Sequence, residues 1–347
     1  MVASATVRVM SPEEIVARAV GETPYFLWPQ PGSVFAERQM RLLQLSRDHP
    51  MGDFLAFIAA LARVQQARLA DFPPVPIPDA AALDRDARRG LPPLSATDWP
   101  RDAAWHEVLR QLVAELQPHA PPGAQAALER LATADADFLE RQADALLTGV
   151  MAGLDLGCAP IVAATLQVYW THLVLQVQAR HAGQGQPFGR LDDQTICPCC
   201  GSRPTASVTR SAGDAPGQRY LHCSLCSMQW HMVRIKCSHC LGTTGLAYQS
   251  IELAGAGDAT DEDAEAASRR AAKAAIQAET CSDCGHYLKI MHTDRDPFVD
   301  ACADDLGSLT LDLLVSETGM LRHGVNLMLL FGEPEPKAAA PPDPGAA

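Results

Sequence analysis

Eight cysteines in four C-x-x-C pairs are the residues best suited to chemistry in this 347-residue chain. Two intervening residues let the backbone turn back, so that both sulfurs of a pair can face one ion at about 2.3 Å. Amides in such a turn can also donate hydrogen bonds to sulfur. Two pairs complete one tetrahedral thiolate site, so four pairs predict two metal sites. The pairs are Cys197/Cys200, Cys223/Cys226, Cys237/Cys240 and Cys281/Cys284.

The segments between the pairs indicate which pairs share an ion. Each half of the region has the same order: a pair, strand-like segments, a second pair and a further strand. The predicted strands are 205–211, 218–223 and 229–236 in the first half, and 246–253, 274–280 and 286–293 in the second. This repetition predicts two tandem rubredoxin-like or zinc-ribbon-like units, the first built on the first two pairs and the second on the last two.

The residue after the second cysteine of each pair is expected to adopt a positive φ, which favours glycine. Gly201 and Gly285 fit this expectation, whereas Ser227 and Leu241 stand at the other two positions. The turns that end at Ser227 and Leu241 are therefore expected to be less ideal.

Four thiolates suit zinc and a single iron equally well, so the prediction is two metal ions, iron or zinc, each bound by four cysteines. Zinc would act as a folding staple, and iron would add one-electron redox capacity. Cys199 must point away from the site because consecutive side chains diverge, and Cys158 and Cys302 are expected to be small core residues. Four histidines beside the pairs are expected to lie next to the ions or at the surface rather than bind them: His222, His231, His239 and His286.

Charge argues against nucleic acid as a partner. The formal net charge of the chain is -13. Residues 195–250 include five basic residues and one acidic residue, which gives a local surplus of positive charge. Two zinc sites of four thiolates would contribute a charge of about -4 and largely offset this surplus. There is no P-loop, no G-x-G-x-x-G after a strand and no H-E-x-x-H helix. Since four protein thiolates leave no open position for Lewis-acid catalysis, the chain is predicted not to be an enzyme.

The elements expected to position the cysteines begin with a helical domain over 1–185. Apolar spacing and capping signals predict helices from Ser11 to about Val20, over 33–46, 54–69, 105–116 and 138–146, and a buried core helix over 158–180. The Pro-rich stretch 71–100 is expected to be an extended connection. Polar residues within 161–177 argue against a membrane span. The rest is divided into metal units over 190–236 and 237–295, a closing helix within 296–330 and a disordered tail over 331–347.

The N-terminal segment shows no sustained apolar run that would indicate a secretory signal, so a cytoplasmic location without membrane insertion is expected. That compartment keeps thiols reduced, which favours metal binding over disulfides. The sequence leaves open whether the protein forms a homo-oligomer.

Four runs closely resemble the formate dehydrogenase accessory protein family, FdhE: CPCCGSRPTASV, RYLHCSLCSMQWHMVRIKCSHC, AETCSDCGHYLKI and DPFVDACADDLGSLTLD. The resemblance covers about 195–315. It implies a cytoplasmic assembly factor for respiratory formate dehydrogenases that contacts the molybdenum- or tungsten-containing catalytic subunit before export. We expect the helical domain to bind this client. The resemblance also implies rubredoxin-like iron or zinc centres in which the eight paired cysteines are essential. Two features depart from the family pattern, namely Cys199 and a long acidic insertion after Leu253.

Three functions are therefore compared below. The leading hypothesis is a maturation factor that binds a client enzyme and carries two metal centres. The alternative is an iron-containing electron-transfer or thiol-redox protein that acts on a client cofactor. A nucleic-acid-binding ribbon is the third and is disfavoured by the charge.

Overall fold

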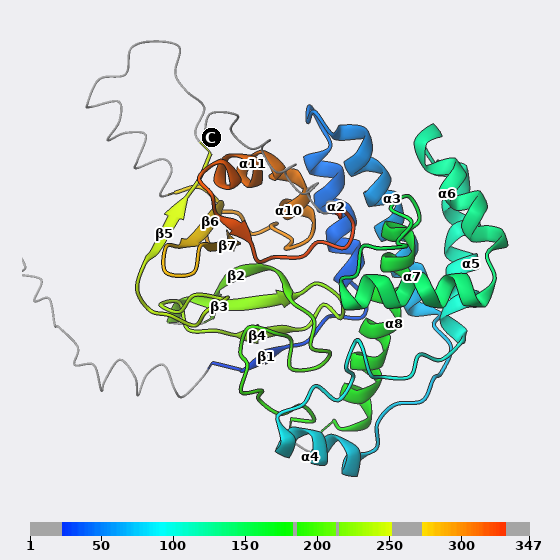
Figure 1. The fold of residues 1–347 in the computed structure, drawn as a ribbon, viewed down its shortest axis with the longest axis horizontal. Coiled ribbons are helices and arrows are strands. Elements are labelled where there is room, and N and C mark those ends of the chain that lie inside the picture. Colours follow the sequence, from blue (N-terminus) through cyan, green and yellow to red (C-terminus); the bar gives the residue numbers. More distant parts are fainter. Residues whose placement is uncertain (1–22, 183–185, 213–214, 252–272, 331–347) are drawn as a thin grey trace, which may run out of the picture.

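The N-terminal half forms helices because its apolar residues recur at helical spacing and are buried, along one side in most of the helices and nearly all round in the central one. The computed structural model describes residues 23–182, 186–212, 215–251 and 273–330. Figure 1 shows the helices of this half on one side of the molecule and the strands on the other. The helices are α2 (Val34–Leu45), α3 (Gly52–Ala70), α4 (Ala80–Arg89), α5 (Ala104–Leu116), the short 3₁₀ helix Gln117–His119, α6 (Pro122–Thr133), α7 (Ala136–Thr148) and α8 (Ala159–Arg180).

Helix α8 is the predicted core helix, and its burial is confirmed. It packs against α3, α5 and α7, and Thr165 and Gln167 find hydrogen-bond partners inside the protein, whereas Thr171 Oγ1 and His172 Nε2 are buried without one among the described residues. Gln167 accepts a hydrogen bond from Gln65 at 3.0 Å and donates one to the carbonyl of Ser224 at 2.8 Å. Within the described residues, no helix combines the length and apolarity that crossing a membrane requires.

The prediction of a wholly extended connection over 71–100 is wrong in its middle, where α4 forms. The carboxylate of Asp79 accepts a hydrogen bond from the amide of Ala82 at 2.7 Å and so caps the helix. Gly90 ends the helix in the left-handed conformation that glycine adopts readily. The prolines on both sides of this capped segment led to the prediction that the whole stretch is extended. Helix α6 was also not predicted.

The C-terminal half forms one mixed sheet rather than two separate ribbons. The strands of this sheet are β1 (Phe26–Leu27), which comes from the N-terminal half, and β2 (Pro204–Ala212), β3 (Ala215–Cys223), β4 (Gln229–His231), β5 (Leu246–Gln249), β6 (Ile276–Cys281), β7 (His286–His292) and β8 (Leu321–Arg322). Strands β2, β3 and β4 form an antiparallel ribbon, as do β5, β6 and β7. The two ribbons join where β2 pairs in parallel with β7, with Ser207 opposite Ile290. The sheet order is β1-β4-β3-β2-β7-β6-β5, with β8 beside β7.

Several strands are shorter than the sequence indicates. The alternating stretch 229–236 keeps strand geometry only over β4, after which the chain turns. In the described part of the stretch predicted over 246–253, which ends at residue 251, only β5 is a strand. Strand β1, which precedes the helices of the described part of the chain, pairs with β4 and so joins the start of that part to the first ribbon. The predicted helix that begins at Ser11, the acidic insertion and the C-terminal tail lie outside the described residues.

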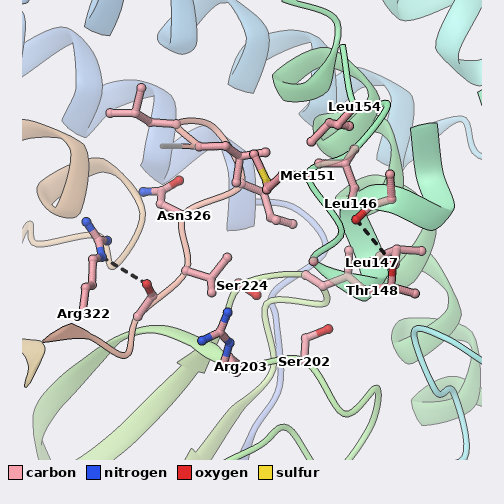
Figure 2. Close-up of a pocket in the computed structure, with 18 of the residues that line it drawn as sticks. Leu146, Leu147, Thr148, Met151, Leu154, Ser202, Arg203, Ser224, Arg322 and Asn326 are labelled. Carbon is pink, nitrogen blue, oxygen red and sulfur yellow. Dashed lines mark hydrogen bonds between the residues drawn. The ribbon is translucent and has the colours of Figure 1, made fainter. Parts of the chain in front are cut away.

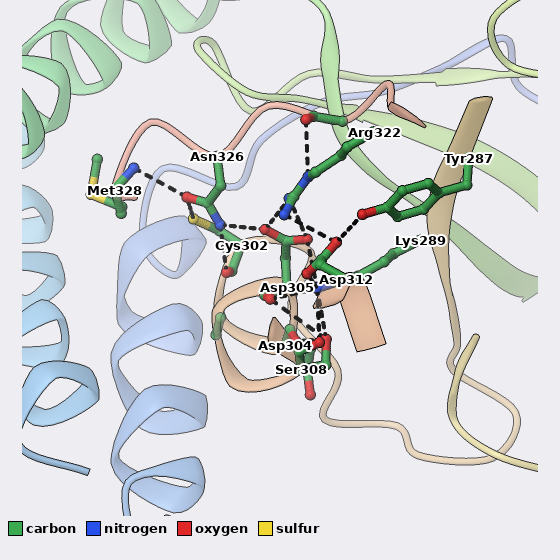
Figure 3. A network of polar contacts seen from close by, with 12 residues as sticks. Tyr287, Lys289, Cys302, Asp304, Asp305, Ser308, Asp312, Arg322, Asn326 and Met328 are labelled. Carbon is green, nitrogen blue, oxygen red and sulfur yellow. Dashed lines mark hydrogen bonds and ion pairs between the residues drawn. The ribbon is translucent and has the colours of Figure 1, made fainter. Parts of the chain in front are cut away.

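Two short helices stand where one closing helix is predicted. They are α10 (Ala303–Gly307) and α11 (Leu309–Glu317), and they meet at Ser308. A buried ionic network holds them on the sheet (Figure 3). In it, the ammonium group of Lys289 on β7 pairs with the carboxylates of Asp305 and Asp312, and Arg322 on β8 pairs with the same two carboxylates.

Candidate metal centres

The first two C-x-x-C pairs bring four buried sulfurs together. The Sγ atoms of Cys197 and Cys226 are 3.6 Å apart, those of Cys200 and Cys223 3.4 Å, and those of Cys200 and Cys226 3.7 Å. A tetrahedron with metal–sulfur bonds of 2.3 Å has edges of about 3.8 Å, so the sulfurs already stand close to the spacing that one ion needs. A disulfide would require about 2.05 Å.

The last two pairs form a second cluster of the same kind. The Sγ atoms of Cys237 and Cys284 are 3.8 Å apart, and those of Cys240 and Cys281 are 3.9 Å apart. In each cluster all four sulfurs lie within 4.8 Å of one another. The repeated order in the sequence thus identified which pairs meet, and each set has the donor chemistry and spacing to hold zinc or a single iron.

All four turns share one backbone geometry. In three of them the amide of the residue after the second cysteine donates to the carbonyl of the first cysteine, at 2.8 Å from Gly201, 3.1 Å from Leu241 and 2.9 Å from Gly285. The residue in this position has a positive φ in every turn, 75° and 68° at the glycines but also 59° at Ser227 and 60° at Leu241. Ser227 and Leu241 therefore adopt the strained conformation despite their side chains, which shows that the cluster geometry outweighs the local preference.

Amides and burial together set the charge that the clusters can carry. The amides of Leu225 and Cys226 both lie 3.4 Å from the Sγ atom of Cys223, and the amide of His239 lies 3.4 Å from that of Cys237. Burial, together with neighbouring thiols, raises the pKa of Cys223 and Cys226 well above the usual value. The interior thus resists several thiolates at once, and a bound cation is what would allow all four to ionise.

Contacts from the helical half cover the first cluster. The amides of Leu94 and Ala96, which follow α4, donate to the carbonyls of Cys199 and Cys200 at 2.9 and 2.8 Å. Helix α8 adds the bond from Gln167 to Ser224, within the second pair. The four cysteines of this cluster belong to the same apolar core as the helices. The helical half and the first cluster therefore share one packed core.

Of the four histidines named above, His239 and His286 are neighbours of the second cluster, whereas His222 and His231 lie on β3 and β4 of the first ribbon. His239 and His286 stack face to face, with ring centroids 3.6 Å apart and planes 9° apart, and His323 meets His239 edge-on at 5.1 Å. One nitrogen each of His239 and His286 lies within 4.8 Å of the Cys284 sulfur. Because an imidazole lone pair lies in the plane of its ring, two parallel stacked rings cannot both point to one ion. The all-sulfur set is therefore the better ligand set.

The three remaining cysteines lie outside both sulfur clusters. Cys199 is fully buried beside the first cluster, and its thiol interacts with those of Cys197 and Cys226, so the prediction that it points away from the site is wrong. Its carbonyl accepts the hydrogen bond from the amide of Leu94, in the segment after α4. Cys158 and Cys302 immediately precede α8 and α10, and burial raises the pKa of each thiol to about 12. At that pKa they remain neutral and packed.

A cavity of about 470 Å³ lies beside the first cluster, and no sequence signal identified it (Figure 2). One wall is apolar and comes from the end of α7 and the loop after it, including Leu146, Met151 and Leu154. The opposite wall comes from the C-terminal segment 322–330. Arg203 and Ser224, from the turns of the first cluster, face the same space. Segments from three distant parts of the chain build this cavity, which is why periodicity and motifs could not indicate it.

Comparison with known proteins covers nearly the whole described chain. The family models "FdhE, N-terminal", "FdhE, central domain" and "FdhE, C-terminal domain" match residues 23–185, 196–234 and 235–329. A protein FdhE homolog of Klebsiella pneumoniae is 34% identical over 333 residues, which is 95% of this chain and all of the relative. A homolog from Pseudomonas aeruginosa is 39% identical over 325 residues, which is 93% of this chain and 98% of the relative.

A solved structure gives the same result. The crystal structure of the FdhE protein from Pseudomonas aeruginosa superposes with a TM-score of 0.73 at 39% identity, covering 88% of this chain and 99% of that one. The chain therefore belongs to the FdhE family of formate dehydrogenase accessory proteins.

Proposed function

We propose that this protein is a cytoplasmic, non-enzymatic maturation factor that binds the catalytic subunit of a respiratory formate dehydrogenase and carries one metal ion, iron or zinc, in each four-cysteine cluster. Membership of the FdhE family over almost the full length is the observation that carries the proposal. The sulfur spacing supports the metal sites, with the eight paired cysteines as ligands.

The cavity beside the first cluster is suited to a client segment. Its apolar wall can take hydrophobic side chains, and the guanidinium of Arg203 is exposed at its edge. We infer that an apolar stretch of the client with a nearby carboxylate binds here, since burial of apolar side chains supplies affinity and an arginine selects an acidic group.

Deletion and complementation test this proposal. Loss of the gene should abolish formate dehydrogenase activity, and the wild-type chain should restore it and co-purify with the catalytic subunit. Met151→Glu, which places a charge in the apolar wall, should abolish both. Val150→Glu changes a neighbour that is 51% exposed and does not line the cavity, so it should behave as wild type. Full formate dehydrogenase activity in the deletion strain would overturn the proposal.

One observation favours the second candidate, an electron-transfer or thiol-redox protein. Cys240 of the second cluster is exposed, so a redox partner could approach its sulfur. Protein purified without air should then contain iron and change oxidation state reversibly. A protein that contains only zinc and shows no such change would exclude electron transfer.

A further inference from the structure

The two sulfur clusters differ sharply in their access to solvent. In the first cluster, all four cysteines are at most 1% exposed. In the second, Cys237 and Cys281 are buried, Cys284 is partly buried and Cys240 is exposed. Clusters with the same donor atoms and nearly the same spacing thus present different surfaces to incoming molecules.

The cause lies in what each cluster packs against. The first cluster lies between the helical half and the sheet, and the segment after α4 hydrogen-bonds directly to its first turn. The second lies at the rim of the sheet, where the turn that carries Cys240 continues into the exposed residues Thr243, Thr244 and Gly245. On its other side, the stacked rings of His239 and His286 lie against Cys284.

Exposure of one thiolate ligand matters because ligand exchange at a closed four-sulfur site needs one sulfur to leave. A cysteine in the first cluster could leave only by displacing packed core side chains, which is costly in a close-packed interior. Cys240 is exposed, so its side chain can turn toward water without crossing the packed core.

We propose that the second centre is an exchange site at which a thiol-bearing partner takes up or delivers a soft metal ion, with Cys240 as the ligand that leaves, whereas the first centre is permanent. The inference rests on the proposed function, in which both clusters hold metal. The incoming thiol releases its proton to water and its sulfur bonds to the ion. The bond from the ion to the Cys240 sulfur breaks, and Cys240 takes a proton from water. No electrons are transferred.

Metal-release kinetics and alkylation of the full-length chain test the exchange site. The protein is loaded with zinc, its content is measured, and glutathione is added with a chromogenic zinc chelator. One equivalent of zinc should leave at least about tenfold faster than the other, a difference of about 1.4 kcal/mol in activation free energy. N-ethylmaleimide followed by peptide mass spectrometry should modify Cys240 first, while the cysteines of the first cluster react only after denaturation.

Matched variants assign the two phases. Cys240→Ser should abolish the fast phase and keep the slow one, and Cys200→Ser, the corresponding position in the first cluster, should do the reverse. If Cys200→Ser does not fold, the order in which cysteines of the wild-type chain are alkylated still shows which cluster exchanges its ligands. Equal release rates, or earlier alkylation of the first cluster, would overturn the exchange site. A starting content below two ions per chain would instead contradict the metal binding in the proposed function.

Discussion

Replacing Lys289 with methionine should destabilise the protein strongly, because this lysine is the centre of the network that holds α10 and α11 on the sheet. The side chain is 1% exposed. Its ammonium donates to the carbonyl of Asp305 at 2.8 Å and to the carbonyl and hydroxyl of Ser308 at 3.2 and 3.0 Å. It also pairs with the carboxylates of Asp305 and Asp312. Methionine has a similar length and supplies none of these interactions.

Arg322 limits how much free energy of unfolding Lys289→Met is expected to lose. Removing one partner of a buried ion pair typically destabilises by about 3–5 kcal/mol, since the remaining charge is uncompensated. Here the guanidinium of Arg322 stays 2.6 Å from Asp305 and 3.2 Å from Asp312, so both carboxylates keep one cation. We therefore expect the lower end of the range, about 3 kcal/mol, which is a large share of the roughly 5–15 kcal/mol of a typical protein.

Urea titration followed by tryptophan fluorescence measures this loss. Lys273→Met, a change at an exposed lysine, is the control and should alter the free energy of unfolding by less than about 0.5 kcal/mol. The double variant Lys289→Met/Asp312→Asn should lose less than the sum of its single variants, by about 1–3 kcal/mol, because it removes opposite charges together. A loss below about 1 kcal/mol for Lys289→Met, with additive double-variant effects, would refute the role given to this network.

Three further predictions concern other parts of the fold. Burial lowers the pKa of His172 to about 4, so its contribution to stability is present above pH 6.5 and lost as the pH falls toward 4. Between pH 7.5 and 5, the free energy of unfolding of His172→Phe, measured by urea titration, should therefore fall by about 2 kcal/mol less than that of the wild type. Gly285→Ala should destabilise by about 1 kcal/mol because the φ of Gly285 is 68°, although a methyl group there would meet no atom. Gly123 is equally open but lies in α6, so Gly123→Ala should stabilise slightly, and thermal melts of both variants test the sign. Cys226→Ser should reduce the metal content from two ions to one, and Cys158→Ser should leave it at two, as elemental analysis would show.

The features that the sequence predicted well are local ones. The paired spacing of the cysteines predicted the turns, the repeated order of segments predicted which pairs meet, and apolar periodicity predicted α2, α3, α5, α7 and α8. Each of these depends on residues close in the chain or on a repeat that brings the same elements together twice. The proposed division of the chain into domains stays a prediction.

The features that the sequence did not indicate depend on long-range packing. Nothing in the alternation of β2 or β7 shows that they pair in parallel, because the pairing joins residues such as Ser207 and Ile290 that are far apart in sequence. The cavity and the Lys289 network likewise form only when the C-terminal segment reaches the sheet.

That C-terminal segment links the parts of the molecule to which function is assigned. The amide of Leu321 donates to the carbonyl of Gly285, next to the second cluster, and the amide of Val325 donates to the carbonyl of Pro204, close to the first. Between them Gly324 lies so close to the sheet that a Cβ atom would stand 2.5 Å from the carbonyl oxygen of Thr205, so only glycine lets the segment lie flat. Val325 and the residues after it then form a wall of the cavity. A client segment bound there, as proposed, would touch the C-terminal segment, which is hydrogen-bonded beside both clusters. Client binding would then reach both metal centres through one structural element.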